Sequence, residues 1–259
     1  MAMTTGSWDP GQYLKFSDER LRPALDLLAR VPLDTASRVV DLGCGTGSMT
    51  AILKRRFAAA DVLGVDGAET MLAKARAAAP DCAFAQADFG TWAPAVPVDL
   101  IFSNAALHWV TGHEAVFPRL VAGLAPGGVL AVQMPAMHDA PLRRLQNEIA
   151  ARVPFAAHLG QSGYARDILS PGAYYDLLRP LVKTLDIWEA TYLHVLSGED
   201  AVVEWAAGSS LRPFLDKLPA DLTPAFRAGY AEALRPHYPR RADGATLLPF
   251  KRLFLLARV

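Results

Sequence analysis

Between residues 38 and 133, short apolar runs alternate with stretches whose apolar residues recur at helical spacing. Runs of about 4–8 apolar residues are typical of buried strands, whereas a period near 3.6 is typical of helices. This alternation predicts a parallel α/β sheet. The predicted strands are 38–42, 62–66, 83–87 and 98–103, and a turn at 124–130 leads into a fifth.

Two helices stand out between these strands. At 68–79, the side chains of Met71, Leu72 and Ala75 share one face, and a proline ends the pattern. A second helix is predicted at 113–124, and a Pro-Gly-Gly sequence follows it. Both helices lie where a parallel sheet needs a crossover between successive strands.

The rest of the chain supplies two more strands and a candidate cap. Residues 185–195 and 247–259 are the best candidates for further strands. Ligands of open α/β sheets bind at the carboxyl edge, where the remaining segments are expected to emerge. We therefore expect a single domain, 1–259, with a mainly helical cap formed by 1–30, 137–180 and 198–244.

Three glycines follow the first predicted strand and suggest a cofactor site. Gly43, Gly45 and Gly47 form a G-x-G-x-G turn, and Asp41 precedes it by two residues. Glycine lets the backbone approach a ligand closely because no Cβ intervenes. The helix predicted to follow offers free N–H groups to a polar ligand. The segment is typical of a nucleotide-type cofactor site.

The spacing of this turn distinguishes between two cofactors. The dinucleotide fingerprint G-x-G-x-x-G would place its third glycine at position 48, which is Ser48. Asp41 would also repel a pyrophosphate, whereas it favours the ammonium and sulfonium of S-adenosylmethionine (SAM). The carboxylate therefore favours SAM over NAD.

Polar residues also follow the later strands. Asp66 ends the second strand, where a carboxylate accepts hydrogen bonds from ribose hydroxyls, a contact that NAD sites share. Asp88 ends the third strand and is expected to accept from an adenine amino group, with Phe89 or Met71 covering the ring. The fourth strand leads into Asn104, whose amide is expected to meet the methionine end of the ligand.

These motifs together resemble the class I SAM-dependent methyltransferases. The matching segments are Asp41-Leu-Gly-Cys-Gly-Thr-Gly47, Gly64-Val-Asp66 with Met71-Leu72, Ala87-Asp88, Asp99-Leu-Ile-Phe-Ser-Asn104 and Leu124-Ala-Pro-Gly-Gly-Val-Leu130. The resemblance implies a Rossmann-like seven-stranded sheet whose last strand is antiparallel and lies between strands five and six. It implies a cofactor set of Arg22, Asp41, Gly43, Gly45, Gly47, Asp66, Gly67, Met71, Ala87, Asp88, Phe89 and Asn104.

A narrower resemblance extends over the cap segments. Six segments look like those of the trans-aconitate 2-methyltransferase family. They are Trp8 to Pro23, Val132-Gln-Met-Pro135, Val203-Glu-Trp205, Gly208 to Pro213, Ala242-Asp-Gly244 and Phe250-Lys-Arg-Leu-Phe254. The resemblance implies methyl transfer from SAM to one carboxylate of trans-aconitate, which gives a monomethyl ester and S-adenosylhomocysteine. Thr46, Ser48 and His108 depart from the family's usual Pro, Asn and Gln, and the last departure weakens a role for His108 as a base.

The expected chemistry needs positioning more than proton transfer. A carboxylate with a pKa of about 4 is already ionised at neutral pH, so no catalytic base is required. An acceptor with three carboxylates needs cationic groups, and the planar fork of arginine binds carboxylates bidentately. The candidate substrate-binding residues are Tyr13, His108, Trp109, Tyr174 and Arg212, and Arg166, Tyr175, Trp205 and Arg252 are weaker candidates.

Other functions remain open at this point. The same fold methylates amines, phenols and carbons, so another small-molecule acceptor is an alternative. A SAM-binding protein without turnover is a second alternative, and an NAD-linked oxidoreductase is a remote one.

Composition narrows the setting of this chemistry. Of the 259 residues, 52% are hydrophobic, and 26 Lys and Arg balance 26 Asp and Glu, so no basic excess points to nucleic acid. The sequence has no run of about 18 apolar residues for a membrane span and no signal-peptide pattern. Cys44 and Cys82 show no metal-ligand spacing, and two thiols suit a reducing compartment. We expect a cytoplasmic monomer or small homo-oligomer without a metal.

Overall fold

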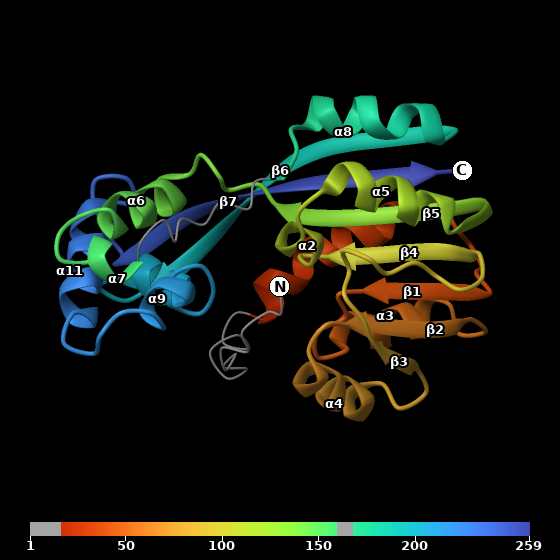
Figure 1. Cartoon of the computed structure of the whole chain (residues 1–259), viewed down its shortest axis with the longest axis horizontal. Coiled ribbons are helices and arrows are strands. Elements are labelled where there is room, and N and C mark those ends of the chain that lie inside the picture. The colour runs from red at the N-terminus through yellow and green to blue at the C-terminus, as the bar shows by residue number, and fades with distance from the viewer. Residues whose placement is uncertain (1–16, 160–167) are drawn as a thin grey trace. The chain divides into compact units, whose positions relative to one another are not determined.

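The computed structural model describes residues 17–159 and 168–259, which divide into two compact units (Figure 1). Of the described residues, unit 2 comprises 20–136, 168–190 and 252–259, and it contains all of the sheet except parts of its last two strands. The described part of unit 1 comes mainly from residues 137–159 and 191–251.

The sheet has seven strands in the order β3-β2-β1-β4-β5-β7-β6. Strands β1 to β5 are joined by parallel ladders, and β7 pairs antiparallel with β5. The predicted sheet, with its antiparallel last strand between strands five and six, is thereby confirmed. The strands are β1 (Arg38–Leu42), β2 (Asp61–Asp66), β3 (Ala83–Gln86), β4 (Val98–Asn104), β5 (Leu124–Pro135), β6 (Thr184–Ser197) and β7 (Ala245–Arg258).

The helices of unit 2 lie close to their predicted positions. The expected helix at 68–79 is α4, and the one at 113–124 is α5. Helix α3 begins directly after Gly47, as the glycine turn predicts. The helical segments are α2 (Ser17–Arg30), α3 (Ser48–Arg56), α4 (Glu69–Ala78), the short η1 (Leu107–Trp109), α5 (His113–Ala122), α8 (Pro171–Leu178) and η2 (Arg179–Leu181).

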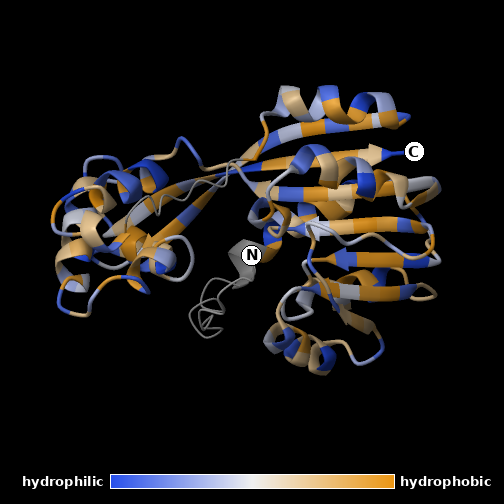
Figure 2. Cartoon of the chain, in the orientation of Figure 1, coloured by the Kyte–Doolittle hydropathy of each residue, from blue (hydrophilic) through white to orange (hydrophobic). Residues whose placement is uncertain are grey.

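The core of unit 2 forms because parallel strands are apolar on both faces. Figure 2 shows the central strands coloured mostly as hydrophobic. Val132, Leu253 and Leu255 belong to one buried cluster with Phe117 of α5 and Tyr174 of α8. Helices α5 and α8 therefore cover one face of the sheet near β5 and β7, and the core holds the strand ends in register.

Unit 1 has a separate, mainly helical core. This core contains four aromatic side chains, Trp205, Phe214, Phe226 and Tyr230. Residues from the C-terminal end of β6 and the N-terminal end of β7 belong to it as well. Tyr230 donates its hydroxyl hydrogen to the carbonyl oxygen of Leu142 at 2.7 Å, which joins two of the helices. Its helices are α6 (Pro141–Ala150), α7 (Ala156–Leu159), α9 (Ala201–Ala207), α10 (Arg212–Leu215) and α11 (Thr223–Leu234).

The units differ from the expected cap in two segments. The expectation placed 137–180 and 1–30 in the cap, whereas the described residues 168–180 and 20–30 cluster with unit 2. The reason is burial: Tyr174 and Leu178 of α8 lie in the core of the sheet-bearing unit, and Ala24 and Leu27 of α2 are fully buried.

Within residues 17–159 and 168–259, no helix has both the length and the hydropathy needed to cross a bilayer.

Candidate functional site

The glycine turn between β1 and α3 is held against β2 by its own backbone. The N–H groups of Gly43 and Cys44 both donate to the carbonyl oxygen of Val65, at 2.7 and 3.0 Å. Gly43 and Gly47 have φ angles of 82° and 81°, in the left-handed region that favours glycine. A Cβ on Gly43 would lie 2.0 Å from the Cβ of Ala106, so no larger residue fits there.

Gly45 differs from its neighbours because nothing lies within 4 Å of the position that its Cβ would take. Its φ angle is 54°, so it also lies in the left-handed region. The middle of the turn therefore presents open backbone, and a ligand can approach it closely.

Asp66 anchors the turn at the end of β2. Its Oδ2 accepts from the N–H of Gly45 and its Oδ1 from the N–H of Ala68, each at 2.9 Å. Each oxygen of an ionised carboxylate accepts more than one hydrogen bond, so the half-buried group keeps acceptor capacity. The arrangement suits a vicinal diol such as a ribose.

Asp41 lies deeper than the sequence suggested. Its side chain is 1% exposed, and its Oδ2 accepts a hydrogen bond from Thr50 Oγ1 at 2.6 Å. The pKa of Asp41 is raised from 3.8 to about 7, mainly because the carboxyl group is buried. The hydrogen bond from Thr50 opposes this rise, and the nearby Asp66 carboxylate adds to it. Asp41 thus holds the start of α3 through Thr50, and its role toward a cationic cofactor stays a prediction.

Residues after β3 form the next part of the edge. Asp88 is exposed, and its Oδ1 accepts from the N–H of Gly90 at 2.8 Å. Phe89 packs against the core of unit 2, and its ring tip lies 3.6 Å from the position of a Cβ on Gly43. The amide of Gln86 donates to the carbonyl oxygen of Gly67 at 3.0 Å, which holds the loops after β2 and β3 together. Ala87 and Met71 are half-buried near these loops.

Asn104 lies at the end of β4 with an unsatisfied atom. Its Oδ1 is buried and has no hydrogen-bond partner among the residues that the structure describes. Ala105, the next residue, has a φ of 52°, an uncommon backbone angle for a residue with a Cβ. Both features are typical of functional sites, because unsatisfied polar atoms and strained backbone are otherwise rare.

His108 and Trp109 lie in η1, directly after this segment. Their rings are 4.9 Å apart, and His108 is 8% exposed while Trp109 is half-buried. The structure thus places both near the carboxyl edge of β4, as the sequence predicts. Their contact with substrate stays a prediction.

Tyr174 has a packing position instead of the expected place in a substrate pocket. It is 0% exposed, and its hydroxyl lies 2.5 Å from Nδ1 of His113. Because His113 Nε2 donates to the carbonyl oxygen of Leu107 at 3.0 Å, its Nδ1 is the acceptor for the Tyr174 hydroxyl. Sequence reasoning missed His113, since a lone histidine in an amphipathic helix carries no pattern.

The structure brings the remaining predicted residues together only in part. Arg22 is exposed on α2. Arg212 lies in unit 1, where its Nε is 3.5 Å from the carboxylate of Asp216. Tyr13 and Arg166 lie outside the described residues.

Arg252 is a weaker candidate in the sequence, and the structure buries its side chain beside another polar one. It is 4% exposed, and one of its guanidinium nitrogens lies 3.5 Å from Oε1 of Gln133, which is 0% exposed. A buried guanidinium is costly without polar neighbours. The only sequence signal was its place in the Phe250-Lys-Arg segment of the final strand.

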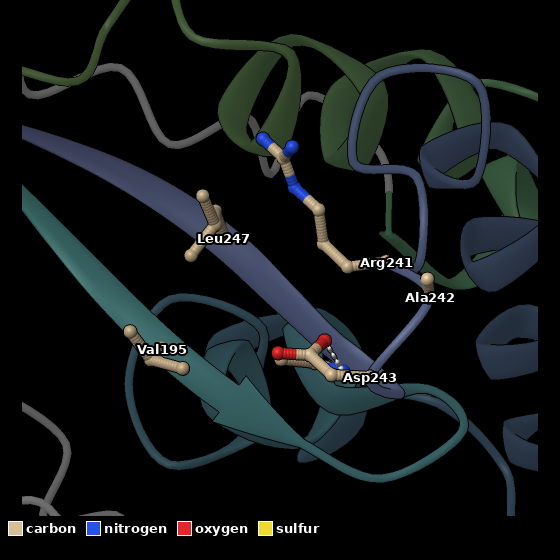
Figure 3. A pocket seen from close by; sticks show the side chains of 6 residues that line it. Val195, Arg241, Ala242, Asp243 and Leu247 are labelled. Atoms are coloured by element: carbon tan, nitrogen blue, oxygen red, sulfur yellow. Dashed lines mark hydrogen bonds between the residues drawn. The ribbon is translucent and has the colours of Figure 1, made fainter.

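Unit 1 has a shallow pocket of about 530 Å³ lined by six residues (Figure 3). The Asp243 carboxylate turns back to accept from the N–H of Ala245 at 3.0 Å, and Arg241 points away from it. None of the predicted cofactor residues lines this pocket. The lining residues are Val195, Arg241, Ala242, Asp243, Ala245 and Leu247.

Two other features bear on the chemistry. The Cys44 thiol is buried, and burial together with the carboxylates of Asp41 and Asp66 raises its pKa, so it stays neutral. Among the described residues, no group of three or more His, Cys, Asp or Glu side chains is arranged to hold a metal ion.

Comparison with known proteins adds the chemistry that this geometry serves. Residues 39–128 match a family model described as a methyltransferase domain. The chain is 48% identical to a trans-aconitate 2-methyltransferase from Variovorax paradoxus, over 97% of this chain and 98% of the relative. A trans-aconitate 2-methyltransferase from Methylobacterium nodulans is 50% identical over the same shares of the two chains.

Solved structures agree at the level of fold. The YcgJ protein from Bacillus subtilis superposes with a TM-score of 0.61 at 15% identity, over 92% of this chain and 98% of that one. A phosphoethanolamine N-methyltransferase from Haemonchus contortus, solved with S-adenosylhomocysteine, superposes with a TM-score of 0.52 at 18% identity. That alignment covers 91% of this chain and 52% of the other.

Proposed function

Because this chain belongs to the trans-aconitate 2-methyltransferase family, we propose that it transfers a methyl group from SAM to one carboxylate of trans-aconitate. The two products are a monomethyl ester of trans-aconitate and S-adenosylhomocysteine. The family and the enzyme class predicted from the sequence are thereby confirmed, as is the SAM-dependent character of the catalytic domain.

The observation that carries the cofactor assignment is the pairing of Asp66 with the open turn at Gly45. The carboxylate is held by the N–H groups of Gly45 and Ala68, and it faces a stretch of backbone that nothing covers within 4 Å of the Gly45 Cβ position. A carboxylate next to the turn disfavours a pyrophosphate and suits an uncharged ribose. The residues present therefore fit SAM.

SAM supplies, when bound, a sulfonium methyl group whose C–S bond breaks as a carboxylate oxygen forms the new C–O bond. Asp66 would hold the ribose hydroxyls, and Asp88 with Phe89 would hold the adenine. The unpartnered Oδ1 of Asn104 accepts hydrogen bonds, which fits the ammonium of the methionine end.

The protein's contribution on the acceptor side is orientation and the exclusion of water. The attacking carboxylate is ionised at neutral pH, so neither His108 nor another side chain has to remove a proton. Correct placement of the reacting atoms supplies about 7–11 kcal/mol in well-oriented systems. His108 and Trp109, directly after β4, are the proposed walls of this site. Tyr13 and Arg212 stay proposed contacts to the acceptor on the ground of the sequence.

The setting of the enzyme is also part of the proposal. The substrate is a small molecule, and the equal numbers of acidic and basic residues support a protein that does not bind nucleic acid. The two free thiols support a place in the cytoplasm. We propose a monomer or a small homo-oligomer, and sedimentation of the purified protein tests this directly.

The activity is tested by incubating the purified protein with methyl-labelled SAM and trans-aconitate. We expect label in a product that releases methanol in mild base, because a methyl ester is base-labile. A panel of uncharged alcohols, phenols and amines at equal concentration serves as the control. Label in one of these acceptors and none in trans-aconitate would overturn the proposal. Tight binding of SAM with no transfer to any acceptor would favour a non-catalytic protein.

A further inference from the structure

Three polar side chains lie side by side on adjacent strands at the edge that carries the glycine turn. Asn104 of β4 is the register partner of Gln133 of β5, and Arg252 of β7 is the register partner of Pro135. Registered side chains share a face of a sheet, and so do residues two apart on one strand. Asn104, Gln133 and Arg252 therefore project from the same face.

This face is the opposite of the one that α5 and α8 cover. Val132 and Leu253 belong to the apolar cluster under those helices, and they alternate with Gln133 and Arg252 along their strands. The antiparallel direction of β7 brings its Arg252 to the carboxyl end of β5. A cation from the last strand thus reaches the edge where ligands of α/β sheets bind.

Gln133 and Arg252 are buried and Asn104 is half-buried, and two of their amide atoms lack hydrogen-bond partners among the described residues. Gln133 is 0% exposed, and its Oε1 accepts a hydrogen bond from the guanidinium of Arg252. Among the described residues, the Nε2 of Gln133 and the Oδ1 of Asn104 are buried and have no hydrogen-bond partner. Because such atoms are rare in folded proteins, two of them on neighbouring strands indicate a place where a polar ligand completes the hydrogen bonds.

Backbone contacts connect this cluster to the cofactor turn. The N–H of Ala105 donates to the carbonyl oxygen of Gln133 at 2.9 Å. The next residue, Ala106, packs directly against Gly43, since a Cβ on that glycine would lie 2.0 Å from it. The cluster therefore adjoins the segment that shapes the glycine turn.

The three groups are complementary to two different charges. The Oδ1 of Asn104 on β4 is a hydrogen-bond acceptor, which suits a cation. The Nε2 of Gln133 on β5 and the guanidinium of Arg252 on β7 are donors, which suit an anion. We propose that Arg252, oriented by Gln133, binds one carboxylate of the methyl acceptor and so selects polycarboxylate substrates. This inference rests on the proposed function, and it adds the residue that confers acceptor specificity.

The first test compares three variants of β7. Arg252→Gln removes the charge, Arg252→Lys keeps the charge without the planar fork, and Arg258→Gln is the matched control. Arg258 lies on the same strand at the opposite end and donates to the carbonyl oxygen of Gly127. We expect Arg252→Gln to raise the KM for trans-aconitate by about 10- to 100-fold, the effect of one charge-assisted hydrogen-bonded contact, with a smaller rise for Arg252→Lys.

Two further measurements separate acceptor binding from cofactor binding and from a purely structural role. They are the affinity for S-adenosylhomocysteine, measured by calorimetry, and the melting temperature. We expect Arg252→Gln to raise the KM for trans-aconitate while its affinity for S-adenosylhomocysteine and its melting temperature stay unchanged. A loss of S-adenosylhomocysteine affinity with an unchanged KM would overturn the inference, because Arg252 would then bind the cofactor. If Arg252→Gln does not fold, Gln133→Leu decides, since it removes the Nε2 donor and should also raise the KM for trans-aconitate.

The second test uses the substrate. Three analogues of trans-aconitate, each with a different carboxylate replaced by a carboxamide, are compared in wild type and Arg252→Gln. The analogue that lacks the methylated carboxylate forms no ester in either protein, so the comparison uses the other two. We expect one of these two to be a poor substrate of the wild type and to lose nothing further in the variant, whereas the other loses activity in the variant. Equal effects of the variant on both would overturn the inference. If the wild type forms no ester from trans-aconitate itself, the proposed function fails instead.

Discussion

Thr50 Oγ1 donates a 2.6 Å hydrogen bond to Oδ2 of Asp41, and this buried pair joins β1 to α3 across the glycine turn. Asp41 precedes the turn and Thr50 follows it, so the hydrogen bond closes the loop that carries the three glycines. The charge of Asp41 is therefore coupled to the shape of the cofactor turn.

The pair predicts a pH dependence of stability. Burial raises the pKa of Asp41 from 3.8 to about 7, so between these values the folded state holds a proton that the unfolded state has released. The contribution of Asp41 to stability is thus fully present below about pH 4 and is lost as the pH rises through about 7. Urea unfolding of wild type and Asp41→Asn should show a difference in unfolding free energy that falls over this window, by roughly 4 kcal/mol at most. A difference that stays constant with pH would contradict the prediction.

A second prediction concerns the close contact at Gly43. Gly43→Ala places a Cβ 2.0 Å from that of Ala106 at a φ of 82°, so we expect strong destabilisation and loss of S-adenosylhomocysteine binding. The matched variant Gly45→Ala has free space around its Cβ and should cost only about 1 kcal/mol of stability, from its φ. Adding Ala106→Gly to Gly43→Ala should restore part of the lost melting temperature. No rescue by the second substitution would mean that the contact is not the cause.

Asp66 should matter for the cofactor more than for the fold. Asp66→Ala removes the proposed ribose contact and two hydrogen bonds to loop N–H groups. We expect affinity for S-adenosylhomocysteine to fall by about 10- to 100-fold, the value of charge-assisted hydrogen bonds, and the protein to stay folded. Calorimetry measures the affinity, and Asp61→Ala at the exposed start of the same strand is the control. Unchanged affinity in Asp66→Ala would refute the ribose assignment.

Tyr174 should behave as a core residue and not as a substrate contact. Tyr174→Phe removes the hydroxyl that donates to His113 and leaves a buried imidazole acceptor unsatisfied. We expect a loss of about 1–3 kcal/mol in unfolding free energy and an unchanged KM for trans-aconitate. Tyr175→Phe, at the exposed neighbouring position, should change neither quantity. A raised KM with full stability in Tyr174→Phe would return the residue to the substrate site.

Arg212 is the proposed clamp in unit 1. Arg212→Ala should raise the KM for trans-aconitate by about tenfold or more, because a carboxylate loses a charged partner, and leave S-adenosylhomocysteine affinity unchanged. Arg227→Ala is the control, since that residue forms an ion pair with Glu204 in the same unit. The reverse pattern, with affinity for the cofactor product lost and KM kept, would exclude Arg212 from the substrate pocket.

The sequence by itself determined the sheet and the cofactor turn. Strand β1 has the predicted bounds, and β2, β3 and β4 differ from prediction by one residue at one end, because an apolar run bounded by a glycine turn or an acidic residue is a local signal. The close backbone contact at Gly43 and the hydrogen-bonded carboxylate of Asp66 also agree with the sequence, since close approach needs glycine and a strand-end carboxylate needs partners. The position of the final strand came from the resemblance to a family and not from its own pattern.

Only the tertiary structure decided which side chains are buried and what they meet. Asp41 and Tyr174 look like ligand contacts in the sequence, yet both are buried and bonded to Thr50 and His113, residues that no local pattern connects to them. Arg252 and Gln133 are 119 residues apart and meet because β7 runs antiparallel beside β5. Burial and pairing of this kind depend on long-range packing, which hydrophobic periodicity along the chain does not encode.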